Sequence, residues 1–428
     1  MSERLIIENF LDLKDINMEV KDINILIGPQ AVGKSVCAKL LFYFKGIIPE
    51  FSNPNNVSKT KREFNNIQTE RFNKYFPQQF LGTSEFKIRF EIGNSFIEIY
   101  NNKKNNIVIS YSDTFSDLRK SFKKELNTIK NSQDDSTSII IDKELFHEFI
   151  QIRDNIYNVF NNTLGSSSGF KQIFIPAGRS FYSILQKNIF TFISNNESLD
   201  PFLSEFGSFY GRIKQYPFFN KKLQAISRQR KVFLQIEKLM NQLLNGNYEI
   251  IKDEDYISLN DGRYISVATA SSGQQEILPL MMVLAWFIII RRKLGYTLYI
   301  EEPEAHLFPT SQKHIVELIS SVFNISNKPP LQFFITTHSP YILTSFNNLI
   351  QAGILQSKLP PEKLDELYKI VPKEQMIDPE KVAAYTLEDG KLINLIDKEY
   401  QIIGADAIDN VSDELGTIFD SLVDMEYK

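Results

Sequence analysis

The segment Ile23-Asn24-Ile25-Leu26-Ile27-Gly28-Pro29-Gln30-Ala31-Val32-Gly33-Lys34-Ser35 decides the fold. Its first five residues form an apolar run typical of a buried strand, and this run ends at a glycine. The spacing G-x-x-x-x-G-K-S follows, and apolar side chains then recur at helical intervals. A strand, a glycine-rich loop and a helix in this order are the context that a phosphate-binding P-loop requires. The segment therefore predicts an α/β fold built around a P-loop.

The chemistry expected of this loop is the binding of a nucleoside triphosphate. Backbone N–H groups of the loop and of the helix start form a cradle for anions. We expect Lys34 to reach the β- and γ-phosphates and Ser35 to be a ligand of Mg²⁺. Gly33 lets the backbone approach a phosphate without a Cβ in the way. The predicted nucleotide-binding residues of the loop are Gly28, Pro29, Gln30, Ala31, Val32, Gly33, Lys34 and Ser35.

The composition is that of an ordinary globular protein without a strong charge bias. The chain has 428 residues, of which 43% are hydrophobic and 23% charged, and its formal net charge is −4. That charge does not suggest a surface coated for nucleic acid, so any DNA contact would be a local patch. The single cysteine, Cys37, excludes an intrachain disulfide, suits a reducing cytoplasm and is expected to be buried.

No targeting or membrane segment is predicted. Residues 1–9 carry charges and lack the long apolar core of a secretory signal. The longest apolar run, Ile277–Ile290, is short for a bilayer span and is expected to be a buried helix. We therefore expect a cytoplasmic protein.

Three further motifs stand at the ends of apolar runs or at the start of a helix. Ser271-Ser272-Gly273-Gln274 opens the long apolar helix. Glu301-Glu302 closes a predicted strand at Thr297–Ile300, and His338 follows the buried run Leu331–Ile335. In an open α/β sheet the carboxyl ends of the strands line one crevice, so we expect these motifs to gather around the P-loop.

Each motif suits a role in phosphoryl transfer, which depends mainly on positioning and on charge stabilisation. Glu301 is expected beside Mg²⁺ through a water molecule. Glu302 is the candidate for polarising the attacking water, and His338 for a hydrogen bond to the γ-phosphate. The alternatives are a surface glutamate pair, a structural histidine and a common Ser-Ser-Gly turn. The buried strands before the first two motifs and the long helix after the third favour the functional interpretation.

Two weaker candidates remain open. Gln78, in the segment Tyr75–Phe80, is either a residue that senses the γ-phosphate and Mg²⁺ or part of a surface turn. Arg179 lies in the turn Pro176–Ser180, after a strand predicted at Gln172–Ile175. It either reaches a phosphate or a partner subunit, or belongs to a plain structural turn.

The remaining chain is predicted from its periodicity. The expected elements are strands at Leu5–Phe10 and Ile16–Val20, a loop or frayed helix over residues 51–73, a β-meander over residues 86–111, a helical hairpin over residues 116–162, a helix over residues 223–244 ended by Gly246, three short strands over residues 248–267, a helix at Ser311–Phe323, a hairpin at Asp389-Gly390, and an amphipathic helix near the C-terminus.

The four motifs together resemble those of ABC-type ATPases, most closely the RecF/SMC-like and OLD-like branch. The P-loop resembles Walker A, residues 271–275 resemble the signature motif, and Glu301-Glu302 resembles Walker B, with Glu302 as the catalytic base. Residues 304–307 would be the D-loop and His338 the switch histidine. Glu301 stands where aspartate is usual, which is a feature of the OLD-like branch. Residues 176–180 also look like a motif of small defence-associated ATPases.

The resemblance implies a fold class and a division of the chain. The fold would be a P-loop NTPase with an ABC-type core, that is, a mixed sheet with an antiparallel β subdomain and helical insertions. The expected parts are an N-terminal ATPase lobe (1–112), a helical insertion (113–165), a core strand and its turn (166–180), a helical arm (181–247), a C-terminal ATPase lobe (248–350) and a C-terminal tail (351–428).

The resemblance also implies a mechanism. ATP and Mg²⁺ would be bound, and residues 271–274 of one subunit would cap the γ-phosphate held by the P-loop of another. Two ATP molecules would then be enclosed in a head-to-tail homodimer, and hydrolysis would open it. About 90 residues follow Pro340, too few for a fused Toprim nuclease, and Asp406, Asp409 and Asp413 more closely match a solvated helix face than a metal site.

The resemblance leaves several functions open. The favoured hypothesis is a sensor or scaffold that controls a separate effector, a nuclease or toxin, in bacterial anti-phage defence. The alternatives are a RecF-like repair ATPase that clamps DNA, a transporter subunit, against which the helical insertions argue, and a scaffold held together by ATP with little hydrolysis.

Overall fold

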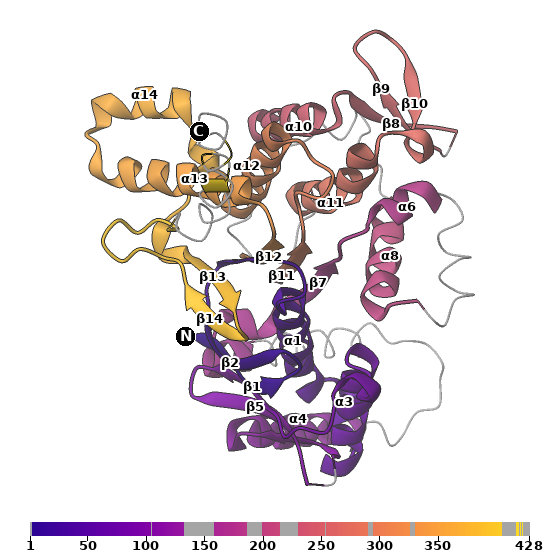
Figure 1. Ribbon diagram of the computed structural model, residues 1–428. Helices are drawn as coiled ribbons and strands as arrows, with labels where there is room; N and C mark the ends of the chain where they lie inside the picture. Colours follow the sequence, from indigo (N-terminus) through magenta and orange to yellow (C-terminus); the bar gives the residue numbers. More distant parts are fainter. Residues whose placement is uncertain are drawn as a thin grey trace.

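The computed structural model of the protein describes residues 2–103, 105–131, 158–185, 199–214, 230–252, 254–289, 294–325, 330–404, 417–418, 420 and 422. Among these residues, eleven strands form one sheet with helices on both faces (Figure 1). Its strands are β1 (Glu3–Phe10), β2 (Leu13–Val20), β3 (Ile23–Ile27), β4 (Lys87–Ile92), β5 (Ser95–Asn101), β6 (Ile107–Tyr111), β7 (Lys171–Ile175), β11 (Tyr296–Glu301), β12 (Leu331–Thr337), β13 (Val382–Glu388) and β14 (Lys391–Asn394).

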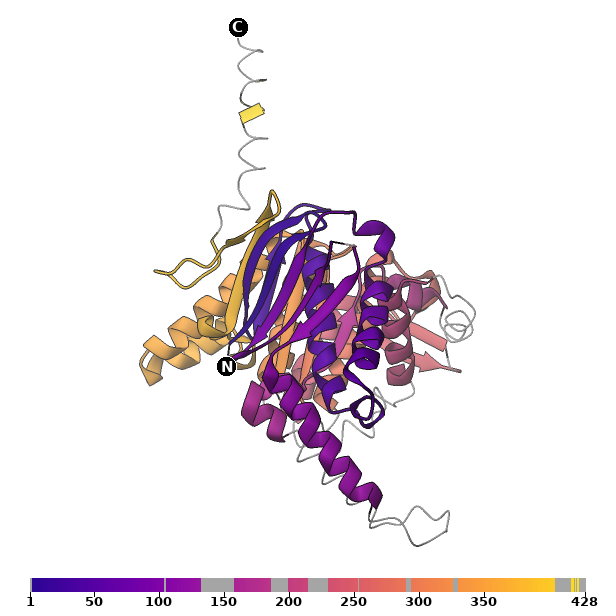
Figure 2. The same ribbon diagram turned by 90° about the horizontal axis from the view of Figure 1, so that it is seen from below.

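The helices belong to two groups on opposite faces of this sheet. The described helices are α1 (Lys34–Ile47), α2 (Pro54–Val57), α3 (Lys61–Tyr75), α4 (Asp113–Asn131), α6 (Ser180–Leu185), α8 (Pro201–Lys214), α10 (Arg230–Leu244), α11 (Ser272–Ile289), α12 (Pro309–Ile325), α13 (Pro340–Lys358) and α14 (Pro361–Ile370). Among them, α1, α3 and α4 share one core with the antiparallel strands, and α4 projects from the body of the molecule (Figure 2). Helices α10 to α13 form the core on the other face.

The sheet joins an antiparallel half to a parallel half. Its strand order is β6-β5-β4-β1-β2-β14-β13-β3-β12-β11-β7. Strands β13, β3, β12, β11 and β7 run parallel to their neighbours within this group, whereas β1, β2, β4, β5 and β6 pair antiparallel. The predicted mixed sheet with an antiparallel β subdomain is therefore confirmed.

Alternating side chains of the parallel strands supply both cores. In β3, Ile23, Ile25 and Ile27 belong to the core that contains α11 and α12, whereas Leu26 belongs to the core that contains α1. Tyr299 of β11 likewise belongs to the core that contains α1. These strands are buried on both faces, which explains why they read in the sequence as continuous apolar runs instead of alternating patterns.

The C-terminal region contributes two strands to the main sheet. The segment expected to be a tail contributes β13, which pairs along its length with the P-loop strand β3. The hairpin predicted at Asp389-Gly390 is confirmed, and the Gly390 carbonyl accepts hydrogen bonds from the N–H groups of Lys14 and Asp15. This hairpin connects the two halves of the sheet, so a boundary at residue 350 does not follow the sheet. The predicted amphipathic helix and Asp406, Asp409 and Asp413 lie largely or wholly outside the described residues.

Other predicted elements can be compared directly with the structure. The β-meander is confirmed as β4, β5 and β6, and the three short strands form a small sheet of β8 (Asn247–Ile251), β9 (Glu254–Ser258) and β10 (Tyr264–Ser266). Of the two alternatives expected for residues 51–73, a loop or a frayed helix, the second half forms a helix, α3. There, Thr60 and Glu63 form a capping box that starts α3. The hairpin predicted over residues 116–162 lies partly outside the described residues.

The long apolar run is a buried helix, as predicted. Helix α11 spans Ser272–Ile289, and its central residues belong to the main core. Among the described residues, no helix combines the length and apolar character needed to span a bilayer. Cys37 is also buried, and burial raises the pKa of its thiol to about 12.

A buried ion pair ties the P-loop helix to both halves of the sheet. Lys45 of α1 donates to both carboxylate oxygens of Glu3 on β1, at 2.8 Å each, and to Oε1 of Gln332 on β12 at 2.6 Å. Both charged side chains are 2% exposed or less. Burial alone would raise the pKa of Glu3, but Lys45 and the neighbouring hydrogen bonds outweigh burial and hold this pKa below its ordinary value.

Removing one member of this pair should destabilise the fold strongly. Lys45→Met leaves the Glu3 charge buried without its cation, so we expect the free energy of unfolding to fall by about 3–5 kcal/mol. Chemical denaturation measures the loss. Glu3→Gln combined with Lys45→Met should recover most of it, because no buried charge remains. A single variant as stable as the parent protein contradicts this account.

The same pair predicts a pH effect. Because the folded-state pKa of Glu3 lies below its unfolded value, its contribution is complete above the unfolded pKa and is lost as the pH falls through the folded pKa. The double variant should lack this part of the acid sensitivity.

Candidate functional site

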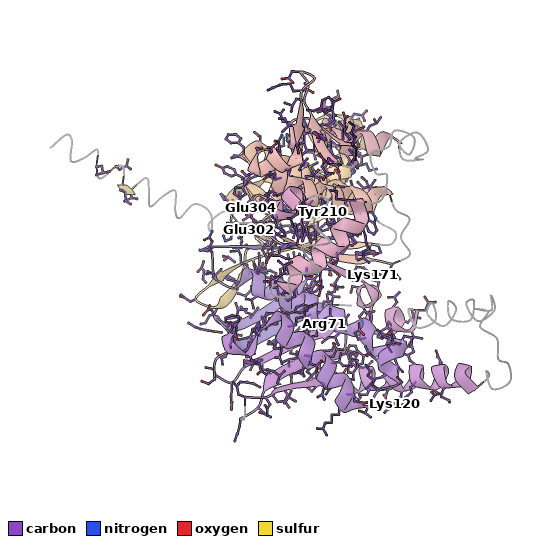
Figure 3. All side chains as sticks on the ribbon, turned by 90° about the vertical axis from the view of Figure 1, so that its right-hand side faces the viewer. Arg71, Lys120, Lys171, Tyr210, Glu302 and Glu304 are labelled. Atoms are coloured by element: carbon purple, nitrogen blue, oxygen red, sulfur yellow. The ribbon has the colours of Figure 1, made fainter. Side chains whose placement is uncertain are left out.

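Four segments meet at the carboxyl edge of the parallel strands. The P-loop follows β3, Glu302 follows β11, His338 follows β12, and the turn at Pro176 follows β7. These strands are parallel neighbours, so their carboxyl ends lie at the same edge. In Figure 3, Glu302 and Glu304 lie close together at this edge, whereas Lys171, at the start of β7, lies at the other end of the strands.

The P-loop has the backbone geometry of an anion cradle. Gly33 has a φ of 99°, and a Cβ at this position would lie 2.6 Å from the side chain of Leu13, so only glycine fits here. No side chain caps the start of α1, where Gly33 is the cap residue. The first N–H groups of this helix are therefore left for a bound anion.

The Lys34 ammonium lies against the backbone of the loop. Its ammonium donates to the carbonyl oxygens of Gly28 at 2.7 Å and Pro29 at 2.6 Å, and lies 3.3 Å from Nδ1 of His338. Partial burial lowers the pKa of Lys34, while Glu302 and Glu304 act in the opposite direction. A phosphate group entering the loop would offer this ammonium a fully charged partner.

His338 links the P-loop lysine to Glu302. Because the ammonium of Lys34 has no acceptor, Nδ1 of His338 must accept, and the ring proton then belongs on Nε2. That nitrogen lies 3.3 Å from a carboxylate oxygen of Glu302. The structure therefore brings Lys34, His338 and Glu302 into one chain of polar contacts.

A cavity of about 260 Å³ lies between the P-loop and these strand ends. Of the residues predicted to act here, Gln30, Ala31, Gly33, Lys34, Ser35, Glu302 and His338 line it. The other lining residues are Leu11, Asp12, Leu13, Val36 and Thr336. The β1–β2 turn was missed from the sequence because nothing local marks it. Only the packing of Leu13 against Gly33 brings it to the site.

The two predicted Mg²⁺ ligands are placed differently. Ser35 lines the cavity and is exposed, as a metal-binding hydroxyl must be. Glu301 is buried outside the cavity lining, and its Oε2 accepts from the N–H of Ala177 at 3.3 Å. No group of three or more His, Cys, Asp or Glu side chains in the described chain could hold a metal ion. The residues fit Mg²⁺ that also binds phosphate oxygens, with Ser35 as the protein ligand.

Glu304 positions the histidine and was not singled out for this from the sequence. Its Oε1 accepts from the backbone N–H of His338 at 2.7 Å. Its Oε2 is shielded from solvent and has no hydrogen-bond partner among the described residues. One carboxylate thus holds the turn after β11 against the turn after β12.

The Ser271–Gln274 stretch does not line this cavity. Ser271 and Gln274 form a reciprocal cap at the start of α11, with Ser271 N–H donating to Gln274 Oε1 at 3.1 Å and Gln274 N–H donating to Ser271 Oγ at 3.4 Å. Ser271 and Ser272 are exposed, and neither lines the cavity. A Cβ on Gly273 would lie 2.7 Å from the carbonyl oxygen of His306, so glycine allows α11 to approach the turn after β11.

Arg179 is a structural residue in this state. Its side chain is fully buried, which excludes the direct contact with a phosphate or a partner that was considered from the sequence. Burial lowers the pKa of Arg179, although Glu276, Glu304, Glu302 and Glu301 oppose this. Gln78 is exposed in a short 3₁₀ turn and does not line the cavity. Its predicted role gains no geometric support.

The amino-acid sequence is similar to those of known ATPases. A sequence model of the family described as AAA ATPase domain matches residues 1–343. Retron Vc95 probable ATPase of Vibrio cholerae serotype O1 biovar El Tor is 26% identical over 134 residues, which are 29% of this chain and 25% of that protein. This chain thus aligns with only a quarter of that relative's length.

Two solved structures are also similar in outline. The SmcHead bound to the C-winged helix domain of ScpA is 12% identical, with 94% of this chain and 99% of that chain covered and a TM-score of 0.42. The recombination mediator protein RecF is 13% identical, with 92% and 98% covered and a TM-score of 0.33. At these scores neither structure carries an argument about the present chain.

Lys34 should be essential for nucleotide binding. Lys34→Ala removes the only loop side chain expected to contact the β- and γ-phosphates, so we expect calorimetry to detect no ATP binding. Lys39→Ala, on the same helix, is the matched control, because Lys39 is partly exposed and contacts Asp200 instead of the loop. Binding retained by Lys34→Ala would defeat the P-loop assignment.

Glu304 should affect turnover through His338. Glu304→Ala removes the acceptor of the His338 N–H, and we expect kcat to fall on the order of tenfold or more, because small misplacements of catalytic groups are costly. Glu304→Gln keeps an acceptor oxygen and should retain most of the activity. Steady-state ATP hydrolysis measures both. Equal kcat values for the two variants would show that this hydrogen bond does not matter.

Proposed function

The chain belongs to the AAA ATPase domain family and is an ATPase, and on this premise we propose that two copies assemble head to tail around ATP. In this assembly the P-loop of one subunit holds the triphosphate and Ser271–Gly273 of the other subunit cap it. ATP-dependent closure and opening then regulate a separate effector protein.

One observation carries the dimer proposal. Ser271 and Ser272 are exposed at the start of an 18-residue helix and do not line the cavity of their own chain. A helix start of this kind is an anion site, yet the cavity formed by the same subunit already contains one at α1. A second subunit gives the exposed site a phosphate to bind.

Two exposed aromatic side chains add support to the dimer proposal. Phe308 is 73% exposed at the end of the turn after β11. Tyr341, at the start of α13, is 52% exposed. Large exposed aromatic side chains are common at interfaces, where they supply buried apolar area.

Within each site, the chain's own residues have separate roles. Lys34 and the N–H groups of α1 bind and orient the phosphates, and Ser35 holds the ion. Mg²⁺, when bound, neutralises phosphate charge. Glu302 orients and polarises the attacking water, and His338 donates toward the γ-phosphate once Lys34 has turned to the nucleotide. Glu304 keeps His338 in place.

Regulation of an effector in anti-phage defence is the broader part of the proposal. It is supported by the resemblance of residues 176–180 to defence-associated ATPases and by the partial match to the retron ATPase. The effector is proposed to be a separate nuclease or toxin. A phage plating assay tests this part, since Lys34→Ala in the full operon should remove protection. Protection that persists without nucleotide binding would contradict it.

Mixing two inactive variants tests the shared site. The Glu302→Gln variant should bind ATP without hydrolysing it. The Ser271→Arg variant should no longer cap the triphosphate that the other subunit binds. A mixed dimer contains one complete site, formed by the P-loop and Glu302 of one chain and Ser271 of the other. Equal mixing should restore about a quarter of the parental rate, because half of random dimers are mixed and each has one working site of two.

The control is each variant alone at the same total concentration, which should be inactive. Mixed dimers must be verified with two different tags. A mixture that contains such dimers and remains inactive would place Ser271 in its own chain's site, or in none, and would overturn the head-to-tail arrangement.

A further inference from the structure

The buried side chain of Arg179 connects α11 with the end of β11. Among the described residues it is one of the largest side chains with no exposed area. A guanidinium group removed from water needs an acceptor for each donor, so the positions of its acceptors show which segments it holds together.

One set of contacts reaches α11. Arg179 Nε donates to the carbonyl oxygen of Glu276 at 3.0 Å. In return the Glu276 carboxylate accepts from the backbone N–H groups of Arg179 at 3.1 Å and Ser180 at 2.8 Å. Glu276 is 1% exposed, so this reciprocal contact is closed to solvent.

The other set of contacts reaches the end of β11. Arg179 Nη1 donates to the carbonyl oxygen of Glu301 at 2.7 Å, and Nη2 donates to that of Glu302 at 3.0 Å. Glu302 has a φ of 44°, a region that a side-chain-bearing residue rarely adopts. The bond to its carbonyl oxygen therefore supports an uncommon backbone conformation at the residue proposed to polarise water.

Both sets of contacts include donors of one planar guanidinium group. Glu276 is five residues after Ser271, which corresponds to about 7.5 Å along a helix axis. The planar guanidinium has donors in a fixed fork, so the carbonyl oxygens of Glu276, Glu301 and Glu302 cannot shift independently without breaking a buried hydrogen bond. Gly273 and the His306 carbonyl make a second close approach between the same two segments.

We infer that Arg179 is a positioning residue that makes the start of α11 and the Glu302 end of β11 move as one unit. This rests on the proposed function, in which Glu302 acts on a chain's own nucleotide and Ser271 on its partner's. Arg179 then transmits the nucleotide state of one site to the cap of the other. The coupling is a property of a single chain and exists before two chains meet.

Hydrogen exchange on monomeric full-length protein tests this inference apart from dimerisation. The protein is diluted until mass photometry shows monomers, and exchange over residues 271–280 is compared with and without Mg²⁺ and a non-hydrolysable ATP analogue. We expect the analogue to change exchange there in the parent protein. Arg179→Lys should lose this change, because a lysine cannot reach both sets of acceptors at once, while the analogue still binds with an unchanged Kd.

Two further variants separate coupling from general damage. Arg119→Lys is the matched control, since Arg119 is also a buried arginine that donates to backbone carbonyls, at Asn56 and Lys59, but in the antiparallel half. The Arg119→Lys variant should keep the change in exchange that the analogue causes. Glu276→Gln should lose the response, because its side-chain NH2 group would face one of the two N–H donors, that of Arg179 or that of Ser180. This variant replaces Arg179→Lys in the test if Arg179→Lys does not fold.

Each outcome either supports or overturns the proposed coupling through Arg179. A response lost in Arg179→Lys or Glu276→Gln, with analogue binding intact and Arg119→Lys unaffected, supports the coupling. A response that persists in the folded variant, or the absence of any response in the parent protein, overturns it. If the coupling holds but mixing of inactive variants restores no activity, the head-to-tail dimer fails and the intrachain link remains.

Discussion

A buried guanidinium group and the strand ends around it satisfy each other's hydrogen-bonding needs. At the end of β11, the backbone carbonyl groups of Glu301 and Glu302 accept hydrogen bonds from the side chain of Arg179. Arg179 also donates to the first turns of α11. Neither a buried arginine nor a buried unpaired carbonyl is stable alone. Together they fix the Glu302 end of β11, the turn after β7 and α11 relative to one another.

The parallel half of the sheet brings the other segments of the site to the same edge as Arg179. Because β3, β12, β11 and β7 run in the same direction, the P-loop, His338, Glu302 and the Arg179 turn emerge at one edge. Lys34 is held by loop carbonyls and His338, and His338 by Glu302 and Glu304. The charges of the site are thus paired internally, and an incoming triphosphate would exchange these contacts for stronger ones.

The site has two faces that do not meet in one chain. The cavity holds the P-loop side, whereas Ser271 and Ser272 lie exposed outside its lining. The same helix start packs tightly on the turn after β11 through Gly273. In the proposed head-to-tail pair of chains, each of these two faces would meet a phosphate group.

The sequence by itself determined the features that arise from neighbouring residues. The P-loop spacing, the strand before it, the Ser271–Gln274 cap and the hairpin at Asp389-Gly390 all depend on local hydrogen bonds and allowed φ angles, so a short pattern specifies each. The gathering of Lys34, Glu302 and His338 also followed, because each ends a recognisable buried strand.

Only the tertiary structure decided which distant segments pair. Nothing local places β13 beside the P-loop strand, brings the Leu11–Leu13 turn to the cavity, or turns Arg179 inward to Glu276, 97 positions away in the chain. Burial changes which groups such a residue can contact. An arginine after a strand is equally suited to a phosphate or to a carbonyl until packing removes it from water, and then only acceptors within reach remain.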